Sequence, residues 1–465
     1  MNTSIQSSFL SDRLNQFFLG LLVLTSAYLL YWGGDYVPQS HFLLFSLATL
    51  FGLFMAFNIG GNDVANSFGT SVGAGTLSIR QALVVAAVFE ISGAVIAGGA
   101  VTDTIRKGIV DLGALTGSAD FDVMDFVYLM MGALLAAALW LLAASRMGWP
   151  VSTTHSIVGG IVGASITLGV ISLGADHAFA LVKWEKIGAI VLSWILSPLL
   201  GGLFAYLVYW GLRRAILNMV DSAEETEQQK GIQAMESLAP IVAALGSCVI
   251  TVMLMFKGLK ALNLDLSIVN ITMIVGMIAV VVWMGVWLLA RDLRGRNAAE
   301  TSFLLFSWMQ VFTAAGFAFS HGANDIANAM GPFAAILDVL HSGNINPKAP
   351  IPPVAMFSFG IALVAGLWFV GKEVIYTVGK RITEIHPASG FAAELSAAGV
   401  VLLASTLGIP VSSTHILVGA VLGIGLLNKD ASWGLMKPIA MAWVVTLPAA
   451  AILASIFLIA LRSMF

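Results

Sequence analysis

The sequence has few charged residues and only one cysteine. Charged residues make up 10% of its 465 residues, whereas soluble globular chains carry about 25%. The formal net charge of −3 argues against nucleic acid as a partner. The lone Cys248 excludes an intramolecular disulfide and a cysteine-based metal site. What remains is 58% hydrophobic, which predicts an all-α polytopic membrane protein without a sizeable soluble domain.

Apolar segments long enough to cross a bilayer recur along the chain. A spanning helix needs roughly 20 apolar residues. The first segment is expected to be a retained span and not a cleaved signal peptide. We expect spans near residues 15–32, 41–59, 80–101, 186–213, 238–258, 268–290, 302–320, 352–376 and 436–463.

Two motifs occur twice, in the same order. Asn62-Asp63 and Asn324-Asp325 lie 262 positions apart, and Pro150 and Pro410, which begin two Pro-Val-Ser-x-Thr-His segments, lie 260 positions apart. Both motifs interrupt apolar stretches, where polar residues are costly. A duplicated membrane unit with paired interruptions points to the binding site of a transporter.

Each Pro-Val-Ser-x-Thr-His segment joins two apolar segments with almost no loop. The pairs are 126–146 with 151–172 and 390–408 with 411–428. The joint fits either an ordinary tight turn or the tip of a re-entrant helical hairpin. Both options place an odd number of crossings between the two Asn-Asp spans, so the sequence predicts inverted repeats with broken helices.

The domain organisation follows from this duplication. We expect a first repeat with the N-terminal span over 1–212, a polar cytoplasmic linker over 213–237, and a connecting span with the second repeat over 238–465. With hairpins assumed, the loops on the N-terminal side carry thirteen basic residues against eight on the other side. The positive-inside bias then places the N-terminus in the cytoplasm.

The Asn-Asp motifs put carboxylates and amides inside these apolar segments. Glycines precede both motifs and can unwind a helix, so we expect a helix break at each one. A single copy could serve only as a helix cap, but the duplication argues for a binding role. The motif residues are Asn62, Asp63, Asn66, Asn324, Asp325 and Asn328.

The Pro-Val-Ser segments predict helix starts rich in hydroxyl groups. A helix start exposes backbone N–H groups and the positive end of the helix dipole, both of which favour an anion. Two such starts facing one another would cradle a tetrahedral oxyanion, although capping alone also explains the hydroxyls. His155 and His415 come next and are expected to be structural. The hydroxyl residues are Ser152, Thr153, Thr154, Ser412, Ser413 and Thr414.

Two further carboxylates, Glu90 and Glu394, lie in apolar stretches at positions that do not correspond between the repeats. Each can ligate a cation, carry a proton or pair with a neighbour. The candidate cation ligands are therefore Asp63, Asn66, Glu90, Asp325, Asn328 and Glu394.

The charges of the motifs require a co-bound cation. A phosphate dianion beside Asp63 and Asp325 would bring about four negative charges together in a low dielectric. The motifs contain no lysine or arginine to balance them. Hard cations or protons must supply the positive charge, so the sequence predicts cation co-transport without a bound cofactor.

These motifs resemble those of the inorganic phosphate transporter (PiT) family. The match lies in residues 61–66, 322–328 and the two Pro-Val-Ser segments, and the resemblance extends from about residue 41 to the end. Gly61 stands where the family pattern usually has alanine. The Gly-Asn-Asp residues of the first motif resemble those of the sodium-type branch of the family, whereas proton-coupled relatives have Phe-His-Asp there.

The resemblance implies a multi-pass protein, expected in a bacterial inner membrane, that imports phosphate with sodium and forms a homodimer. It places phosphate between the two Asn-Asp motifs and the hairpin tips, and it implies functional acids at Glu90 and Glu394. The site residues carried over are Asn62, Asp63, Ser152, Thr153, Asn324, Asp325, Ser412 and Ser413.

Several alternative functions remain. A proton-coupled phosphate permease or a sulfate permease would use the same fold. An aspartate favours phosphate over sulfate, because phosphate carries an O–H that a carboxylate can accept. An intramembrane aspartyl protease would also need two aspartates, but not a duplicated anion cradle. A passive anion channel would need basic lining residues. The sequence thus favours a transporter over an enzyme.

Overall fold

The computed structural model describes residues 13–97, 109–111, 121–255, 266–346, 351–406 and 411–465. These ranges are helical, and their only β-pairing is an isolated bridge between Val110 and Val182. Eleven helical segments within them are long and apolar enough to cross a membrane. The predicted all-α polytopic fold is confirmed, and the inverted repeats and re-entrant hairpins stay predictions.

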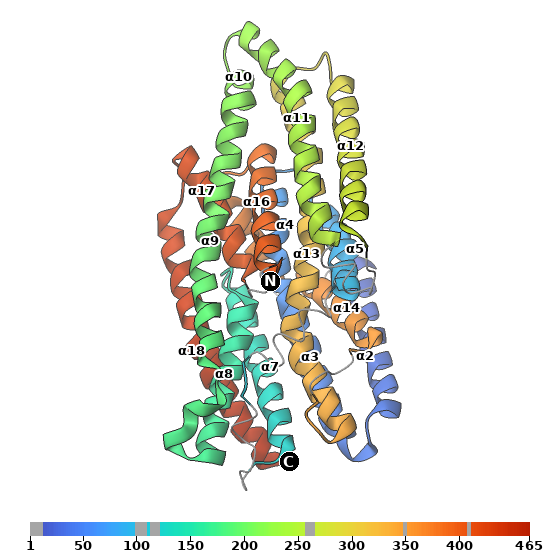
Figure 1. Cartoon of the computed structure of the whole chain (residues 1–465), viewed down its shortest axis with the longest axis vertical. Coiled ribbons are helices and arrows are strands. Elements are labelled where there is room, and N and C mark those ends of the chain that lie inside the picture. Colours follow the sequence, from blue (N-terminus) through green and yellow to red (C-terminus); the bar gives the residue numbers. More distant parts are fainter. Residues whose placement is uncertain (1–12, 98–108, 112–120, 256–265, 347–350, 407–410) are drawn as a thin grey trace, which may run out of the picture.

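The helices form one elongated bundle (Figure 1). The first half contains α2 (Arg13–Tyr36), η1 (Gln39–His41), α3 (Phe42–Ile59), η2 (Gly60–Val64), α4 (Ala65–Gly73), α5 (Ile79–Ala97), α7 (Val123–Arg146), α8 (Thr153–Leu173), η4 (Ala175–Leu181) and α9 (Trp184–Leu212). The middle contains η5 (Arg213–Leu217), α10 (Asn218–Val220), α11 (Glu225–Leu254) and α12 (Ile268–Asp292). The second half contains α13 (Ala298–Ser342), α14 (Pro353–Val370), α15 (Lys372–Tyr376), η7 (Thr377–Arg381), α16 (Pro387–Thr406), α17 (Ser413–Asn428) and α18 (Trp433–Met464).

The expectation of a helix break at both Asn-Asp motifs is wrong. The first motif forms a π-helical turn, η2, that continues directly from α3 into α4. The second motif lies inside α13, an unbroken helix of 45 residues. At 1.5 Å per residue, α13 is roughly 68 Å long, so the predicted span 302–320 covers only part of it.

Close packing explains the glycines at these motifs better than unwinding does. A Cβ added to Gly60 would lie 1.6 Å from the carbonyl oxygen of Leu363, and one added to Gly322 would lie 2.2 Å from that of Glu90. Only glycine permits such an approach of two helices. Gly60 belongs to the first motif and contacts α14, whereas Gly322 belongs to the second and contacts α5. Each motif helix therefore packs on a helix of the other half.

The helices after the Pro-Val-Ser segments repeat this exchange. In α8, a Cβ on Gly163 would lie 2.4 Å from the carbonyl oxygen of Ala451 in α18. In α17, a Cβ on Gly423 would lie 2.2 Å from the carbonyl oxygen of Gly202 in α9. The two halves therefore interlock through four close crossings, which bring their motifs to the centre of the bundle.

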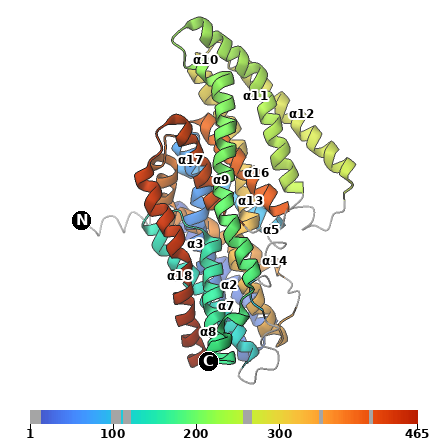
Figure 2. The ribbon, with the colours of Figure 1, turned by 60° about the vertical axis from the view of Figure 1, so that its left-hand side comes forward.

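Of the middle helices, α11 packs against α13 and α16, and α12 packs mainly against α11. The polar segment predicted as a linker, 213–237, forms η5, α10 and the first turns of α11, at one end of the molecule. Figure 2 shows α12 leaning away from the bundle.

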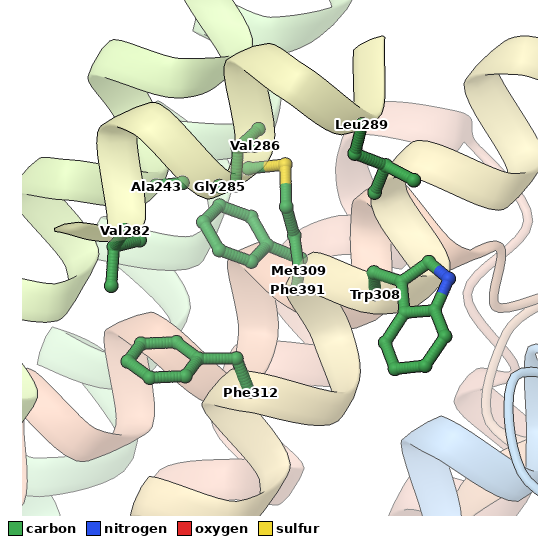
Figure 3. Close-up of a pocket in the computed structure, with 9 residues that line it drawn as sticks. All are labelled: Ala243, Val282, Gly285, Val286, Leu289, Trp308, Met309, Phe312 and Phe391. Atoms are coloured by element: carbon green, nitrogen blue, oxygen red, sulfur yellow. The ribbon is translucent and has the colours of Figure 1, made fainter. Parts of the chain in front are cut away.

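A cavity of about 230 Å³ opens between α11, α12, α13 and α16, and hydrophobic side chains such as Val282, Trp308 and Phe391 line it (Figure 3). Among the described residues, no titratable group lines this cavity, so these side chains offer no charge to bind an anion.

Candidate functional site

Two capped helix starts meet at the centre of the molecule. Ser152 and Ser412 are the N-caps of α8 and α17, and their hydroxyl oxygens accept from the backbone N–H of His155 and His415, each at 3.2 Å. The rings of the two histidines lie 4.4 Å apart between centroids. Capping fixes the first turn of each helix, so the hydroxyls that follow are held at one place.

Asp63 lies between these two helix starts. It is 2% exposed. The Thr153 hydroxyl donates to Asp63 Oδ2 at 2.5 Å, and the Thr414 hydroxyl donates to Oδ1. One carboxylate therefore joins the first Asn-Asp motif to both Pro-Val-Ser segments.

Asp325 accepts hydroxyl and amide donors and also contacts a histidine. Ser413 Oγ donates to Asp325 Oδ2 at 2.7 Å, and Asn324 Nδ2 donates to Oδ1 at 3.1 Å. His321 Nε2 lies 2.6 Å from Asp325 Oδ2, and His321 Nδ1 lies 3.1 Å from Glu90 Oε2. We call Glu90, His321 and Asp325 the acid–histidine chain; all three are buried.

The two motifs thus meet in one polar cluster. Ligand atoms of Asp63, His321 and Asp325 all lie within 4.8 Å of one another. Two carboxylates at that separation repel by roughly 3 kcal/mol at an effective dielectric constant of 20. Among the described residues, no lysine or arginine pairs with either aspartate. A cation or a proton at this cluster would relieve the repulsion.

The other motif asparagines position the hydroxyl groups. Asn62 Nδ2 donates to Ser145 Oγ at 3.0 Å and to the Trp149 carbonyl at 2.9 Å, and Asn62 Oδ1 accepts from the Val151 N–H at 3.0 Å. Asn62 thereby holds the turn between α7 and α8.

In the second motif, Asn328 Nδ2 lies 3.0 Å from Thr153 Oγ1 and 3.3 Å from Thr154 Oγ1. It therefore orients hydroxyls of the first half. The side chain of Asn66 and the residue Pro410 lie outside the described part of the structure.

Glu394 belongs to a second buried cluster that is separate from the aspartates. Its Oε1 accepts from the hydroxyls of Thr70 and Ser71, both at 2.7 Å, and its Oε2 accepts from Thr313 at 2.8 Å. Gln310 Nε2 donates to Oε1 at 3.2 Å. Glu90, in contrast, reaches the central cluster through His321, so the structure gives the two predicted acids different surroundings.

Comparison with known proteins supports one family. A family model described as the phosphate transporter family matches residues 59–454. The chain belongs to this family. Relatives provisionally named phosphate permease include a protein of Mycobacterium bovis, 50% identical over 513 residues, covering 96% of this chain and 92% of that protein. Another, of Pyrococcus furiosus, is 39% identical over 425 residues, covering 89% and 95%.

A solved structure of a protein named the sodium-dependent phosphate transporter has the same fold. It matches with a TM-score of 0.79 and 32% sequence identity, covering 91% of this chain and 100% of that one. Membership of the family makes this chain a phosphate transporter and excludes the intramembrane protease considered above. The matched residues 59–454 contain both copies of both motifs.

The sequence reasoning missed one member of the central cluster of this phosphate transporter. His321 directly precedes the second motif and lies four residues before Asp325, a spacing that places two side chains on one helix face. That spacing was a usable signal in an apolar segment. The donors around Glu394 come from other helices, and no local pattern in the sequence indicates them.

Proposed function

We propose that this transporter imports inorganic phosphate together with sodium ions, and that both bind at the central cluster. The observation that carries the proposal is the meeting of Asp63 and Asp325 with hydroxyl groups from two helix starts. Hydroxyls and backbone N–H groups at helix starts suit an oxyanion, and paired carboxylates suit a hard cation with oxygen ligands. The similarity to a sodium-dependent phosphate transporter supports sodium as that cation.

Competition for the same hydroxyls explains how the two ligands would be coupled. Thr153, Thr414 and Ser413 now donate to the two aspartates. A phosphate needs these donors, so it must displace the carboxylates from them. Cations bound to Asp63 and Asp325 would compensate the lost hydrogen bonds and the added negative charge. Phosphate and cation would then bind well only together.

The proposed ligand sets follow from this arrangement. Residues proposed to contact phosphate are Asn62, Asp63, Ser152, Thr153, Thr154, Asn324, Asp325, Ser412, Ser413 and Thr414. Those proposed to hold or pass cations are Asp63, Asn66, Glu90, Asp325, Asn328 and Glu394. Ser152 and Ser412 accept one capping bond each, and their O–H groups can still donate to phosphate.

Uptake into proteoliposomes with sodium and pH gradients imposed separately tests the coupling. We expect an inward sodium gradient at constant pH to drive phosphate accumulation above its external concentration, and this accumulation to disappear when sodium is equal on both sides. Uptake that continues unchanged without the sodium gradient would refute sodium coupling. Competition with sulfate in the same assay tests the anion, and we expect sulfate to compete poorly.

Proton coupling is the second candidate, and the acid–histidine chain favours it. Glu90, His321 and Asp325 form a buried run of three groups that can each hold a proton. In membranes such runs serve as proton relays. Uptake driven by a pH gradient in the absence of sodium would select this alternative.

We also propose that 1–212 holds an N-terminal span and the first repeat, that 213–237 is a cytoplasmic linker, and that 238–465 holds a connecting span and the second repeat. We further propose that the protein is a homodimer of the bacterial inner membrane. Cysteine pairs introduced across the contact between copies would test the dimer by cross-linking. Labelling of a cysteine introduced at Glu225 from each side of the membrane would test the orientation.

A further inference from the structure

Two buried histidine side chains connect the two helix starts. His155 and His415 are the third residues of α8 and α17, and they are 3% and 2% exposed. Their rings are nearly perpendicular, at 88°, with centroids 4.4 Å apart. Capping uses only the backbone N–H of each histidine, so neither imidazole has a part in the ligand sets proposed above.

Two tryptophans extend this contact on both sides. The Trp194 ring of α9 lies 3.5 Å from the His155 ring, and the Trp443 ring of α18 lies 3.8 Å from the His415 ring, between centroids. Trp443 Nε1 also donates to the carbonyl of Pro150 at 2.9 Å, where the first Pro-Val-Ser segment begins. We call Trp194, His155, His415 and Trp443 the aromatic column. Its four helices lie together on one side of the bundle (Figure 1).

Helix packing holds the two tryptophans at the ends of the aromatic column in place. The helix α9 packs on α17, where a Cβ on Gly201 would lie 2.5 Å from the carbonyl oxygen of Ile416. The helix α18 packs on α8, where a Cβ on Gly159 would lie 2.8 Å from the carbonyl oxygen of Leu447. Each tryptophan therefore belongs to a helix in close backbone contact with the other half, and the two histidines fill the space between the tryptophans.

The aromatic column is attached to the hydroxyls that hold Asp63. His155 follows Thr153 by two residues, and His415 directly follows Thr414. The hydroxyls of Thr153 and Thr414 donate to the two carboxylate oxygens of Asp63. Each hydroxyl shares a helical turn with one histidine ring, so the separation of the two rings determines the separation of the two hydroxyls. Groups that bind a ligand have to be held to within about 0.5 Å.

Packing, and not hydrogen bonding, positions the two imidazole rings. Among the described residues, none of their four nitrogens makes a hydrogen bond of normal geometry. A neutral imidazole carries one donor and one acceptor, and leaving such a group buried and unpaired costs about 1–3 kcal/mol. The rings are therefore held by their faces and edges, and the protein uses their size and flat shape at this position.

We propose that the aromatic column fixes the distance between the two helix starts, with His155 and His415 as positioning residues for the transported oxyanion. The inference rests on the proposed function, in which phosphate binds between the hydroxyls of these helix starts. A smaller side chain at either histidine leaves room for the helix starts to move relative to one another. The hydroxyls are then no longer arranged in advance for the anion, and the affinity for phosphate falls.

Truncation of either ring tests the proposal by uptake into proteoliposomes. His155→Ala or His415→Ala should raise the apparent KM for phosphate about tenfold, equivalent to about 1.4 kcal/mol. Uptake at saturating phosphate should change little, because a loss that affects binding alone raises KM and leaves kcat unchanged. His415→Phe keeps a flat ring without nitrogens and should retain the KM of the parent. The control Phe45→Leu removes a fully buried ring from α3, far along the chain from both helix starts, and should lower stability without changing KM.

The two histidine rings should act as one unit. The double variant His155→Ala/His415→Ala should have nearly the same KM as either single variant, because the contact between the rings is already lost in each of them. Effects of two contacting residues are not additive, and additive effects on KM would overturn the proposal. Free energies of unfolding of the same variants give a second double-mutant cycle, which measures the contact between the rings whatever the protein transports.

The outcomes separate this inference from the proposed function. A raised KM in both alanine variants, with the parental KM in His415→Phe and Phe45→Leu, supports the proposal. Parental KM values in folded alanine variants would overturn it, even where Asp63→Asn abolishes uptake and the central site stands. A KM raised equally in His415→Phe and His415→Ala would also overturn it, because a ring nitrogen, and not the shape of the ring, would then be needed. Uptake retained in Asp63→Asn and in Asp325→Asn would refute the proposed function and, with it, the binding role of the aromatic column.

Discussion

The two Asn-Asp motifs share their sequence but not their surroundings. Asp63 lies in a π-helical turn and is held by hydroxyls of both helix starts. Asp325 lies in an unbroken α-helix and contacts His321, one turn before it. The residue one turn before Asp63 is Ile59. The duplication therefore kept the carboxylates and changed what accompanies them.

The difference extends to the next contacts outward. His321 also contacts Glu90 on α5, and the position that corresponds to Glu90 in the other half is Leu363 by alignment of Gly93 with Gly366. The second motif thus belongs to a run of three titratable groups, whereas the corresponding positions beside the first motif, Ile59 and Leu363, are apolar. We infer that both motifs bind the anion, whereas the second motif also binds or passes the cation or proton that is transported with it.

The largest expected effect comes from neutralising either aspartate. Asp63→Asn or Asp325→Asn should lower phosphate uptake at least about 100-fold, because each variant removes a carboxylate proposed to hold the co-transported cation; this loss corresponds to about 3 kcal/mol of binding free energy. Uptake by purified protein in proteoliposomes is the measurement. Equal membrane insertion serves as the control, and saturable uptake retained in both variants would contradict the assignment of the site.

Glu90 and His321 can be replaced by the apolar residues that stand at the corresponding positions of the other half. His321→Ile alone should destabilise the protein by about 3 kcal/mol or more, because Glu90 then loses its partner while buried. The double variant Glu90→Leu/His321→Ile copies Ile59 and Leu363 and should recover most of that loss. Unfolding by denaturant measures both.

The double variant also separates stability from transport. If the acid–histidine chain carries the co-transported cation or proton, the double variant should fold well and yet transport phosphate about tenfold more slowly. Full uptake by the double variant would show that the acid–histidine chain has only a structural role. Equal loss of stability in the single and double variants would contradict the pairing of Glu90 with His321.

Part of the site and the general fold could be predicted from the sequence. The meeting of Asp63 with Thr153 and Thr414 was predictable, because two repeated motifs inside apolar segments have few other uses. The hydroxyls were predictable from the chemistry of helix starts. The general fold followed from long apolar segments, since only helices satisfy their own backbone across a membrane in such a chain.

The remaining features depend on contacts between distant helices. Whether a glycine unwinds a helix or permits a close crossing depends on what faces it, and Gly322 faces the Glu90 carbonyl. The role of His321 likewise depends on a residue 231 positions away. Two of the three hydroxyls that donate to Glu394 come from Thr70 and Ser71, more than 300 positions away. Local patterns contain no information on these pairings.

Glycine variants test whether the two motifs are equivalent in packing despite their different backbones. Gly60→Ala and Gly322→Ala should each destabilise the protein by roughly 1–3 kcal/mol, because the added methyl group meets a backbone carbonyl. The matched control is Gly276→Ala in α12, where a Cβ meets nothing within 4 Å. The control should be neutral or slightly stabilising, since alanine favours helix. A neutral Gly60→Ala would contradict the crossing with Leu363.

The smallest contrast concerns the motif asparagines. Asn62 is fully buried and makes one hydrogen bond to the end of α7 and two to the turn after it. Asn324 is less buried and donates to its neighbour Asp325. Asn62→Ala leaves the Val151 N–H without its acceptor, so it should cost about 1–3 kcal/mol, against about 1 kcal/mol or less for Asn324→Ala. Denaturant unfolding measures the difference.

Hydrogen exchange then locates the effect of Asn62. Exchange at the Val151 amide should accelerate in Asn62→Ala and stay unchanged in Asn324→Ala, because only the first variant removes the acceptor of that N–H. Similar losses of stability in both variants, with no change in exchange at Val151, would mean that the two asparagines stabilise the protein in the same way. The first motif would then not anchor the turn between α7 and α8, and the difference between the two halves would reduce to His321 and Glu90.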